Sequence, residues 1–485
     1  MNPHLTTQNP EITEPNSIMP TTPTPMTALA QKKAKSTADK TAVKDFINTE
    51  YQRAWFNANA GVHLVKKGDQ IVPDKGYLKG LEYPLRQWIK DTKVIKSTIS
   101  ELDAYLKHAR SIQFHGPIAG FRTGDTVKCN GISWLVTSSA IHVDPVAGTW
   151  PHLQRLVETL LPCDTARLAF YSWLKVQMNA IRSGRHSACP MLILAGDAND
   201  GKTFLLTLIT LLRGGREINP IQAWAGDGPC WTDHLIGAEC LNIDDSVSFK
   251  DYRSRQNLAT KFKEAIYGST ITIDKRNHTS FTLSPRPVWG VCMVANANGN
   301  AIKVLPALDG DDMKDKAIVL RTHRAEIYLR DTGDNGAELR LKAYTDELPH
   351  FLHWLLNDFV IPTELPEGCI KDRAGLVIYR DPAAMTLLHR ESPAGLLEEV
   401  LYEIAESHGQ FTVGKNSAET FTTAEFINWC KTWFDRDRRI PDSLVSTGQY
   451  LSHIANRPDG PIEDAGVNRT GSKLWRFRQF LELKN

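Results

Sequence analysis

Positions 196–203 of this 485-residue chain read Gly196-Asp197-Ala198-Asn199-Asp200-Gly201-Lys202-Thr203. A short apolar run, 191–195, precedes this glycine loop, and an apolar stretch with helical spacing, 204–212, follows it. Strand, loop and helix in this order are the context that the G-x-x-x-x-G-K-[ST] pattern requires. Backbone N–H groups of such a loop and the start of the helix attract phosphate. The stretch therefore predicts an ATP site, with Lys202 on the β- and γ-phosphates and Thr203 on Mg²⁺.

The composition is ordinary for a globular protein, and at roughly 150 residues per domain the length allows two to four domains. A net charge of +2 gives no global signature of nucleic-acid binding, so any DNA contact must come from a local patch. The eight cysteines form no C-x-x-C pair, which argues against zinc and fits a reduced, cytoplasmic setting. We find no membrane-length apolar run and no signal-peptide core, and expect no membrane partner.

Two carboxylates follow the next apolar strand, since Cys240-Leu241-Asn242-Ile243 leads into Asp244 and Asp245. One carboxylate at a strand end can hold Mg²⁺ through water, and its neighbour can orient the attacking water. We assign Asp244 to Mg²⁺ and Asp245 to the water. The two roles can be exchanged, because sequence does not set side-chain direction.

A third strand, 288–294, ends near Asn296, with Asn298 as a second candidate. An amide at a strand tip can hydrogen-bond the γ-phosphate or the lytic water. Asparagine in this position is most often a turn former, and it is the place of Asn296 in the series that makes it a site candidate.

Between these strands, residues 269–283 alternate β-branched and polar side chains around a basic centre, which predicts a hairpin. Lys275, Arg276 and His278 fall at or near its tip. A basic tip is usually a solvated turn, but in a ring-shaped motor it would point into the pore and contact the phosphates of DNA.

These motifs together resemble the superfamily 3 helicases of the AAA+ class, most closely the helicase part of phage and plasmid primase-helicases. The glycine loop resembles motif A, Asp244-Asp245 motif B, Gly268 through Lys275 the B′ region, and Asn296 with 305–309 motif C. All lie within about 115 residues, the compact spacing typical of this superfamily. The likeness covers roughly 150–360.

The resemblance implies an α/β P-loop fold, a homo-oligomeric ring that is expected to be a hexamer, and 3′-to-5′ movement on single-stranded or forked DNA. It also implies an arginine finger from the neighbouring subunit after motif C. We assign Arg321 or Arg324 to this role, although Lys316 stands where several relatives keep arginine. Gly299 replaces a proline that is frequent in relatives.

The rest of the chain predicts flanking domains. Residues 1–42 are polar and are expected to be a disordered tail, with a basic cluster at Lys32, Lys33 and Lys35. We expect a small α+β domain at 43–148 without primase activity, a helical collar at 149–182, the ATPase domain at 183–360 and a connector at 361–391. Residues 392–485 predict a winged-helix-like domain, locally basic through Arg436, Arg438, Arg439, Arg469, Lys473, Arg476 and Arg478.

Local patterns add four expectations in these flanks: a helix at 51–55, a hairpin at 62–72, a helix pair split near Pro162, and a helix at 349–359 with its proline in the first turn.

Three functions remain open from sequence. The first is an ATP-driven DNA helicase in replication of a phage, plasmid or mobile element, working with a primase or other replication proteins. The second is a nucleic-acid-triggered NTPase switch without unwinding, in defence or regulation. The third is an origin-binding protein whose oligomeric state ATP regulates. A P-loop kinase is disfavoured because the basic hairpin would have no role.

Overall fold

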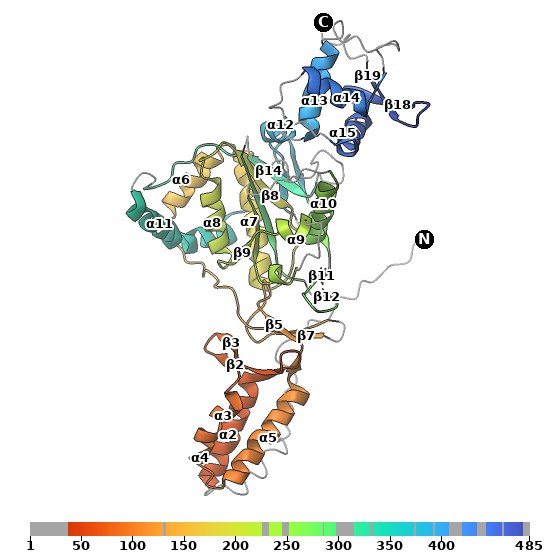
Figure 1. Ribbon diagram of the computed structural model, residues 1–485. Coiled ribbons are helices and arrows are strands. Elements are labelled where there is room, and N and C mark those ends of the chain that lie inside the picture. The colour runs from red at the N-terminus through yellow and green to blue at the C-terminus, as the bar shows by residue number, and fades with distance from the viewer. Residues whose placement is uncertain are drawn as a thin grey trace, which may run out of the picture. The chain divides into compact units, whose positions relative to one another are not determined.

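The computed structural model describes residues 37–129, 132–225, 232–244, 252–284, 286–296, 315–329, 333–372, 375–390, 393–406, 420–433, 443–457 and 460–478. Several expectations lie outside them: most of the 1–42 tail with its lysine cluster, Asp245, Asn298, Gly299, residues 305–309, and Arg436, Arg438 and Arg439. The chain forms two compact units, Met1–Ser139 and Ala140–Asn485, which Figure 1 shows as ribbons.

The first unit combines helices with two small sheets. Its elements are α2 (Thr37–Arg53), β1 (Ala54–Asn57), β2 (Val62–Lys67), β3 (Gln70–Asp74), α3 (Tyr77–Gly80), α4 (Glu82–Arg86), α5 (Thr92–Ala109), β4 (Ser111–Ile112), β5 (Phe114–Gly116), β6 (Thr126–Cys129) and β7 (Ile132–Val136). The sheets have the strand orders β3-β2-β1-β4 and β5-β7-β6.

The hairpin expected at 62–72 is confirmed, because β2 and β3 pair antiparallel across the turn at Gly68. The helix expected at 51–55 is wrong in its second half. Helix α2 ends at Arg53, and the buried Trp55 lies in β1 opposite Leu64. Pairing with β2 therefore overrides the helical pattern of this short stretch.

The second unit is built on a parallel five-stranded sheet of order β14-β8-β13-β10-β9. The strands are β8 (Met191–Gly196), β9 (Glu217–Ile218), β10 (Cys240–Ile243), β13 (Gly290–Asn296) and β14 (Ala317–Arg321). All six residues of β8 are buried, as expected for a strand with neighbours on both edges and helices on the faces. The glycine loop starts where β8 ends, between β14 and β13 in the sheet.

Helices α6 (Pro151–Leu160), α8 (Lys202–Leu212) and α11 (Gly333–His353) pack together beside the sheet, with α9 (Ile221–Ala225) and α10 (Tyr252–Tyr267) on its other side in Figure 1. Helix α7 (Asp164–Ser183) follows α6 after the break at Pro162, which confirms the split helix pair. The buried side chains of α6, α7, α8 and α11 and of β8, β13 and β14 share one apolar core.

The position of Pro349 corrects an expectation. It lies inside α11, which begins at Gly333, and the chain continues into the π-helical turn η4 (Trp354–Asp358). A proline inside a helix removes a hydrogen bond and costs about 3 kcal/mol. Tyr344, Leu348 and Leu352, four residues apart and buried on one face, hold the helix together across this defect.

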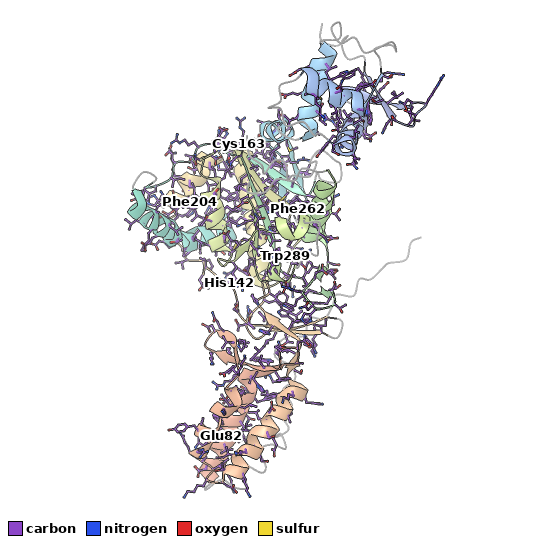
Figure 2. All side chains as sticks on the ribbon, in the orientation of Figure 1. Glu82, His142, Cys163, Phe204, Phe262 and Trp289 are labelled. Carbon is purple, nitrogen blue, oxygen red and sulfur yellow. The ribbon has the colours of Figure 1, made fainter. Side chains whose placement is uncertain are left out.

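A buried arginine fixes the junction between α10 and the hairpin of β11 (Ile271–Ile273) and β12 (Phe281–Leu283). The Arg286 guanidinium donates to the carbonyls of Glu264, Ala265 and Gly268, which end α10. Burial lowers the pKa of Arg286 to about 10, so it stays charged at neutral pH. The Arg286 guanidinium also lies over the ring of Trp289, 5.5 Å from its centre. Figure 2 labels Trp289 and Phe262, a residue of α10.

The remaining elements are η1 (Asp233–Leu235), β15 (Cys369–Lys371), β16 (Val377–Tyr379), α12 (Pro382–Arg390), α13 (Pro393–Glu406), β17 (Thr420–Thr422), α14 (Thr423–Trp433), α15 (Leu444–Asn456), β18 (Ile462–Val467) and β19 (Lys473–Phe477). Helix α14 begins with a capping box, in which the Thr422 N–H donates to the Glu425 carboxylate and the Glu425 N–H donates to the Thr422 hydroxyl. Among the described helices, none is long and apolar enough to cross a membrane.

We predict that Arg286→Ala loosens the start of the hairpin, because three carbonyls at the end of α10 lose their donor in a buried position. Local opening of 264–283 should become easier by roughly 2–4 kcal/mol, measured by native-state amide hydrogen exchange. Arg276→Ala, an exposed arginine of the same hairpin, should change it by less than about 0.5 kcal/mol. Equal exchange in the two variants would show that Arg286 does not hold the junction.

Candidate nucleotide site

The glycine loop connects β8 to α8, with Gly196 as the last residue of the strand and Lys202 as the first of the helix. Gly201 has φ +116° and Asn199 φ +62°, so the backbone turns through left-handed conformations. Such turns aim successive N–H groups into one concavity, which suits an anion. At Gly196 a Cβ would overlap Thr322, which explains the need for glycine there.

The Asp200 carboxylate holds the loop in place. Asp200 and Lys202 are both only 3% exposed. Oδ1 of Asp200 accepts from the backbone N–H of Lys202 and lies 3.0 Å from its Nζ, which also donates to the Asp197 carbonyl at 2.6 Å. Oδ2 accepts from the Thr322 hydroxyl, just beyond β14. A bound triphosphate would therefore compete with Asp200 for the Lys202 ammonium.

The sheet brings the strand-end candidates to the same edge. Asn296 ends β13 and pairs directly with Gly196, and Asp244 follows β10, the next strand over. The Asp244 carboxylate is exposed and accepts from the Asn219 amide at 3.1 Å. Because β13 lies between β8 and β10, Asn296 stands between the glycine loop and Asp244 along this edge.

Mg²⁺ suits this edge chemically. The Thr203 hydroxyl and the Asp244 carboxylate are oxygen groups on exposed residues, and Mg²⁺ is a hard cation that prefers oxygen ligands. Among the described residues, no three His, Cys, Asp or Glu side chains form a group that could hold a metal. Phosphate oxygens and water would complete the coordination, as is usual for Mg²⁺ with nucleotides.

The three candidates for the arginine finger, Arg321, Arg324 and Lys316, lie at two different places on the sheet. Arg321 ends β14 opposite Ala195, and Arg324 follows three residues later; both are exposed at the edge where the loop of the same chain lies. Lys316 precedes β14, forms an ion pair with Asp315 at 2.7 Å and lies 4.4 Å from the centre of the Tyr267 ring. A role in a neighbouring subunit stays a prediction for all three.

The hairpin tip is built as a supported turn. Its first residue, Asp274, exchanges backbone and hydroxyl hydrogen bonds with Thr232 at 2.8 and 2.9 Å. Lys275 pairs with Asp233 at 2.8 Å, whereas Arg276 and His278 are exposed. The structure thus confirms the hairpin and places its three basic residues at the turn.

The sequence predicts Asp200 as part of the nucleotide-binding loop but gives its carboxylate no separate role, and it does not single out Thr322 or Asn219. A carboxylate two residues before Lys202 was the available signal for Asp200. Thr322 and Asn219 gave none, because their partners are 122 and 25 residues away in sequence.

We predict that Asp200→Asn strengthens ATP binding. The substitution keeps one of the two side-chain oxygens, replaces the other with an NH2 group and removes a negative charge that competes with the triphosphate. At an effective dielectric constant near 20, loss of one close charge should lower the Kd for Mg-ATP about tenfold or more, measured by calorimetry. Asp346→Asn, which breaks an exposed Asp–Lys pair in α11, is the matched control and should leave Kd unchanged. Weaker binding by Asp200→Asn would contradict the competition.

Comparisons with known proteins found structural neighbours only. No protein-family model and no curated protein matches the chain. An apo structure of the NrS-1 C-terminal region has TM-score 0.46 at 11% identity, covering 87% of this chain and 95% of that one. A structure of SCCmec type IV Cch, described as an active helicase, has TM-score 0.38 at 13% identity, covering 89% and 93%. Because both TM-scores lie below 0.5, no function is transferred from these structures to this chain.

Proposed function

We propose that the chain is an ATP-dependent DNA helicase of the superfamily 3 type in the AAA+ class, active in replication of a phage, plasmid or mobile element. Its expected form is a homo-oligomeric ring, a hexamer with 3′-to-5′ polarity, in the cytoplasm of a bacterial or infected cell. Single-stranded or forked DNA is the expected substrate, and a primase or other replication proteins are the expected partners.

One observation carries the proposal. The strand order β14-β8-β13-β10-β9 places the glycine loop, Asn296 and Asp244 side by side at the carboxyl edge of one parallel sheet. A loop that binds phosphate, an oxygen ligand for Mg²⁺ and an amide for the γ-phosphate are the parts needed for phosphoryl transfer by positioning and electrostatics. An isolated phosphate-binding turn would need neither of the other two.

Each residue has a role in this proposal. The loop 196–203 binds the phosphates, Lys202 neutralises charge on the β- and γ-phosphates, and Thr203 and Asp244 hold Mg²⁺. Asp245 orients the attacking water. Asn296 hydrogen-bonds the γ-phosphate or this water. Arg321, Arg324 or Lys316 would complete the site of a neighbouring subunit.

The hairpin and the C-terminal elements support a DNA substrate. Arg276 and His278 are exposed on a turn that Asp274 and Arg286 anchor to the ATPase core. The last elements follow the order α13, β17, α14, α15, β18 and β19, with the strands in the antiparallel order β17-β19-β18. Three helices with a β-wing match a winged helix, so we propose 392–485 as a second DNA-contacting domain.

We predict that Lys202→Ala abolishes strand displacement, because the triphosphate loses its main cation. On forked DNA the wild type should displace the strand only with ATP and only from forks with a 3′ tail, whereas the variant should show at least a 100-fold lower rate, read by fluorescence of the released strand. Lys342→Ala, an exposed lysine in a surface pair, is the control. DNA-stimulated hydrolysis without displacement by the wild type would favour the NTPase switch instead.

We predict a second, separable defect for the triple variant Lys275→Ala, Arg276→Ala and His278→Ala. Basal ATPase should remain, while the affinity for single-stranded DNA falls at least tenfold and the slope of log K against log salt decreases by about 1–2, since phosphate contacts are lost. Fluorescence anisotropy over a salt series measures both. The control replaces Lys66 and Lys67 in the β2–β3 hairpin with alanine. Unchanged DNA affinity in the triple variant would rule out the hairpin as the DNA contact.

A further inference from the structure

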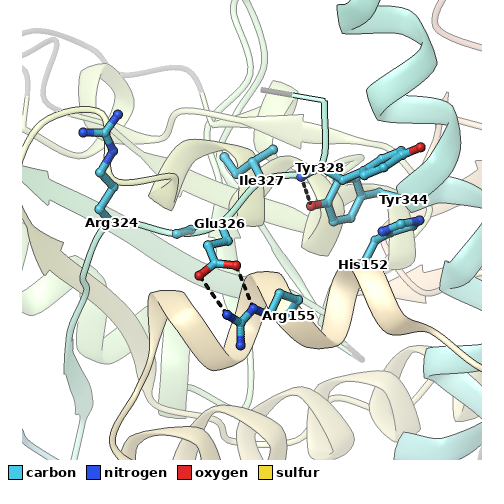
Figure 3. Close-up of a pocket in the computed structure, with 8 residues that line it drawn as sticks. His152, Arg155, Arg324, Glu326, Ile327, Tyr328 and Tyr344 are labelled. Atoms are coloured by element: carbon cyan, nitrogen blue, oxygen red, sulfur yellow. Dashed lines mark hydrogen bonds and ion pairs between the residues drawn. The ribbon is translucent and has the colours of Figure 1, made fainter. Parts of the chain in front are cut away.

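A second feature of the ATPase core lies directly beside the glycine loop. It is a pocket of about 500 Å³, within the roughly 300–1,000 Å³ of small-molecule sites. Figure 3 shows its lining, which combines three aromatic rings with charged groups: His152, Arg155, Arg324, Ala325, Glu326, Ile327, Tyr328 and Tyr344. The roles proposed so far use only Arg324 among these residues.

One hydrogen bond joins the pocket lining directly to the loop, because the N–H of Ala325 donates to the Asp200 carbonyl at 2.8 Å. Three residues earlier, the N–H of Thr322 donates to the carbonyl of Ala195 in β8, also at 2.8 Å. The Tyr344 ring packs edge-on against Phe204, the residue after Thr203, with centroids 5.0 Å apart. The pocket wall and the phosphate-binding loop are therefore parts of one rigid arrangement.

The topology tells which part of a nucleotide would reach this pocket. Strand β8 has β13 on one side and β14 on the other. Asn296 and Asp244 lie on the β13 side, where the γ-phosphate and Mg²⁺ are placed in the proposed function. The segment 322–328 follows β14 and lies on the opposite side. A triphosphate with its γ end near Asn296 extends its nucleoside end toward 322–328.

The aromatic rings offer a surface for a flat heterocycle. His152 and Tyr328 are stacked with centroids 4.0 Å apart and planes 21° apart, and Tyr328 is 45% exposed. The Tyr328 N–H donates to the Tyr344 hydroxyl at 3.0 Å, which keeps the rings in register. A partly exposed tyrosine backed by a second ring is suited to stack a nucleobase.

Both walls of the pocket are held by polar contacts. Helix α6 lacks a side-chain cap of its own, and the buried Glu347 of α11 accepts from the N–H groups of His152 and Leu153 at 3.1 and 2.8 Å. At the surface, Arg155 of α6 and Glu326 of the segment 322–328 form a two-pronged ion pair with both distances 2.8 Å, which joins the two sides of the pocket. The rings are thus positioned before any ligand binds.

We propose that this pocket binds the base of the nucleoside triphosphate, with Tyr328 as the stacking face and His152 as its support. The inference rests on the proposed ATP site and adds the residues that recognise the nucleoside. It also gives Arg324 a contact with the nucleotide of its own chain, which leaves Arg321 and Lys316 as candidates for the finger.

The test compares Mg-ATP with Mg-tripolyphosphate, which has the phosphates without a base, by calorimetry on the full chain. The wild type should bind ATP at least tenfold more tightly than tripolyphosphate, since stacking contributes that much per base. The double variant His152→Ala, Tyr328→Ala should bring this ratio close to one without changing tripolyphosphate affinity. Tyr328→Phe, which keeps the ring, should preserve the ratio.

Two controls separate the possible failures. Tyr402→Ala removes a tyrosine of similar exposure in α13 and should keep the wild-type ratio. Lys202→Ala should lose both ligands, and a wild type that binds neither would overturn the proposed ATP site itself. If the double variant still prefers ATP over tripolyphosphate as strongly as the wild type, the base does not bind in this pocket and the inference is wrong.

Discussion

The parallel pairing of β8 with β13 on one edge and β14 on the other determines where the described candidate side chains near the glycine loop lie. Because parallel strands end at the same edge, the register Asn296–Gly196 and Arg321–Ala195 sets polar groups beside the glycine loop. All six residues of β8 are buried, so the strand that sets this register is covered on both faces. The geometry of the candidate site is therefore a consequence of sheet packing.

The Asp200 carboxylate connects the glycine loop to the chain segment that follows β14. It accepts from Lys202 within the loop and from Thr322 beyond β14, and both Asp200 and Lys202 are almost fully buried. A nucleotide that attracts the Lys202 ammonium would take a positive charge away from the Asp200 carboxylate. Asp200 is hydrogen-bonded to Thr322, the first residue of the segment 322–328. The proposed base pocket begins in that segment, so phosphate binding and base binding share one structural element.

Much of this arrangement could be predicted from sequence, because local patterns encode it. The glycine motif between apolar runs, the strand before Asp244 and the alternating hairpin around Lys275 all follow from periodicity and turn chemistry. What could not be predicted depends on residues distant in sequence. Glu347 caps helix α6 from a position 194 residues away in sequence. Arg286, which follows the hairpin in sequence, binds the carbonyls at the end of α10. Pro349 was misplaced because long-range packing of Tyr344 and Leu352 outweighs a local helix-breaking signal.

The most direct test of the composite site is a cryo-electron microscopy structure of the protein with Mg²⁺, a non-hydrolysable ATP analogue and forked DNA. We expect the triphosphate on residues 196–203, Mg²⁺ contacted by Thr203 and Asp244, Asn296 beside the γ-phosphate, and the turn at Arg276 against the DNA strand. A nucleotide bound away from this edge, or a hairpin turned away from DNA in an assembled ring, would contradict the proposed helicase.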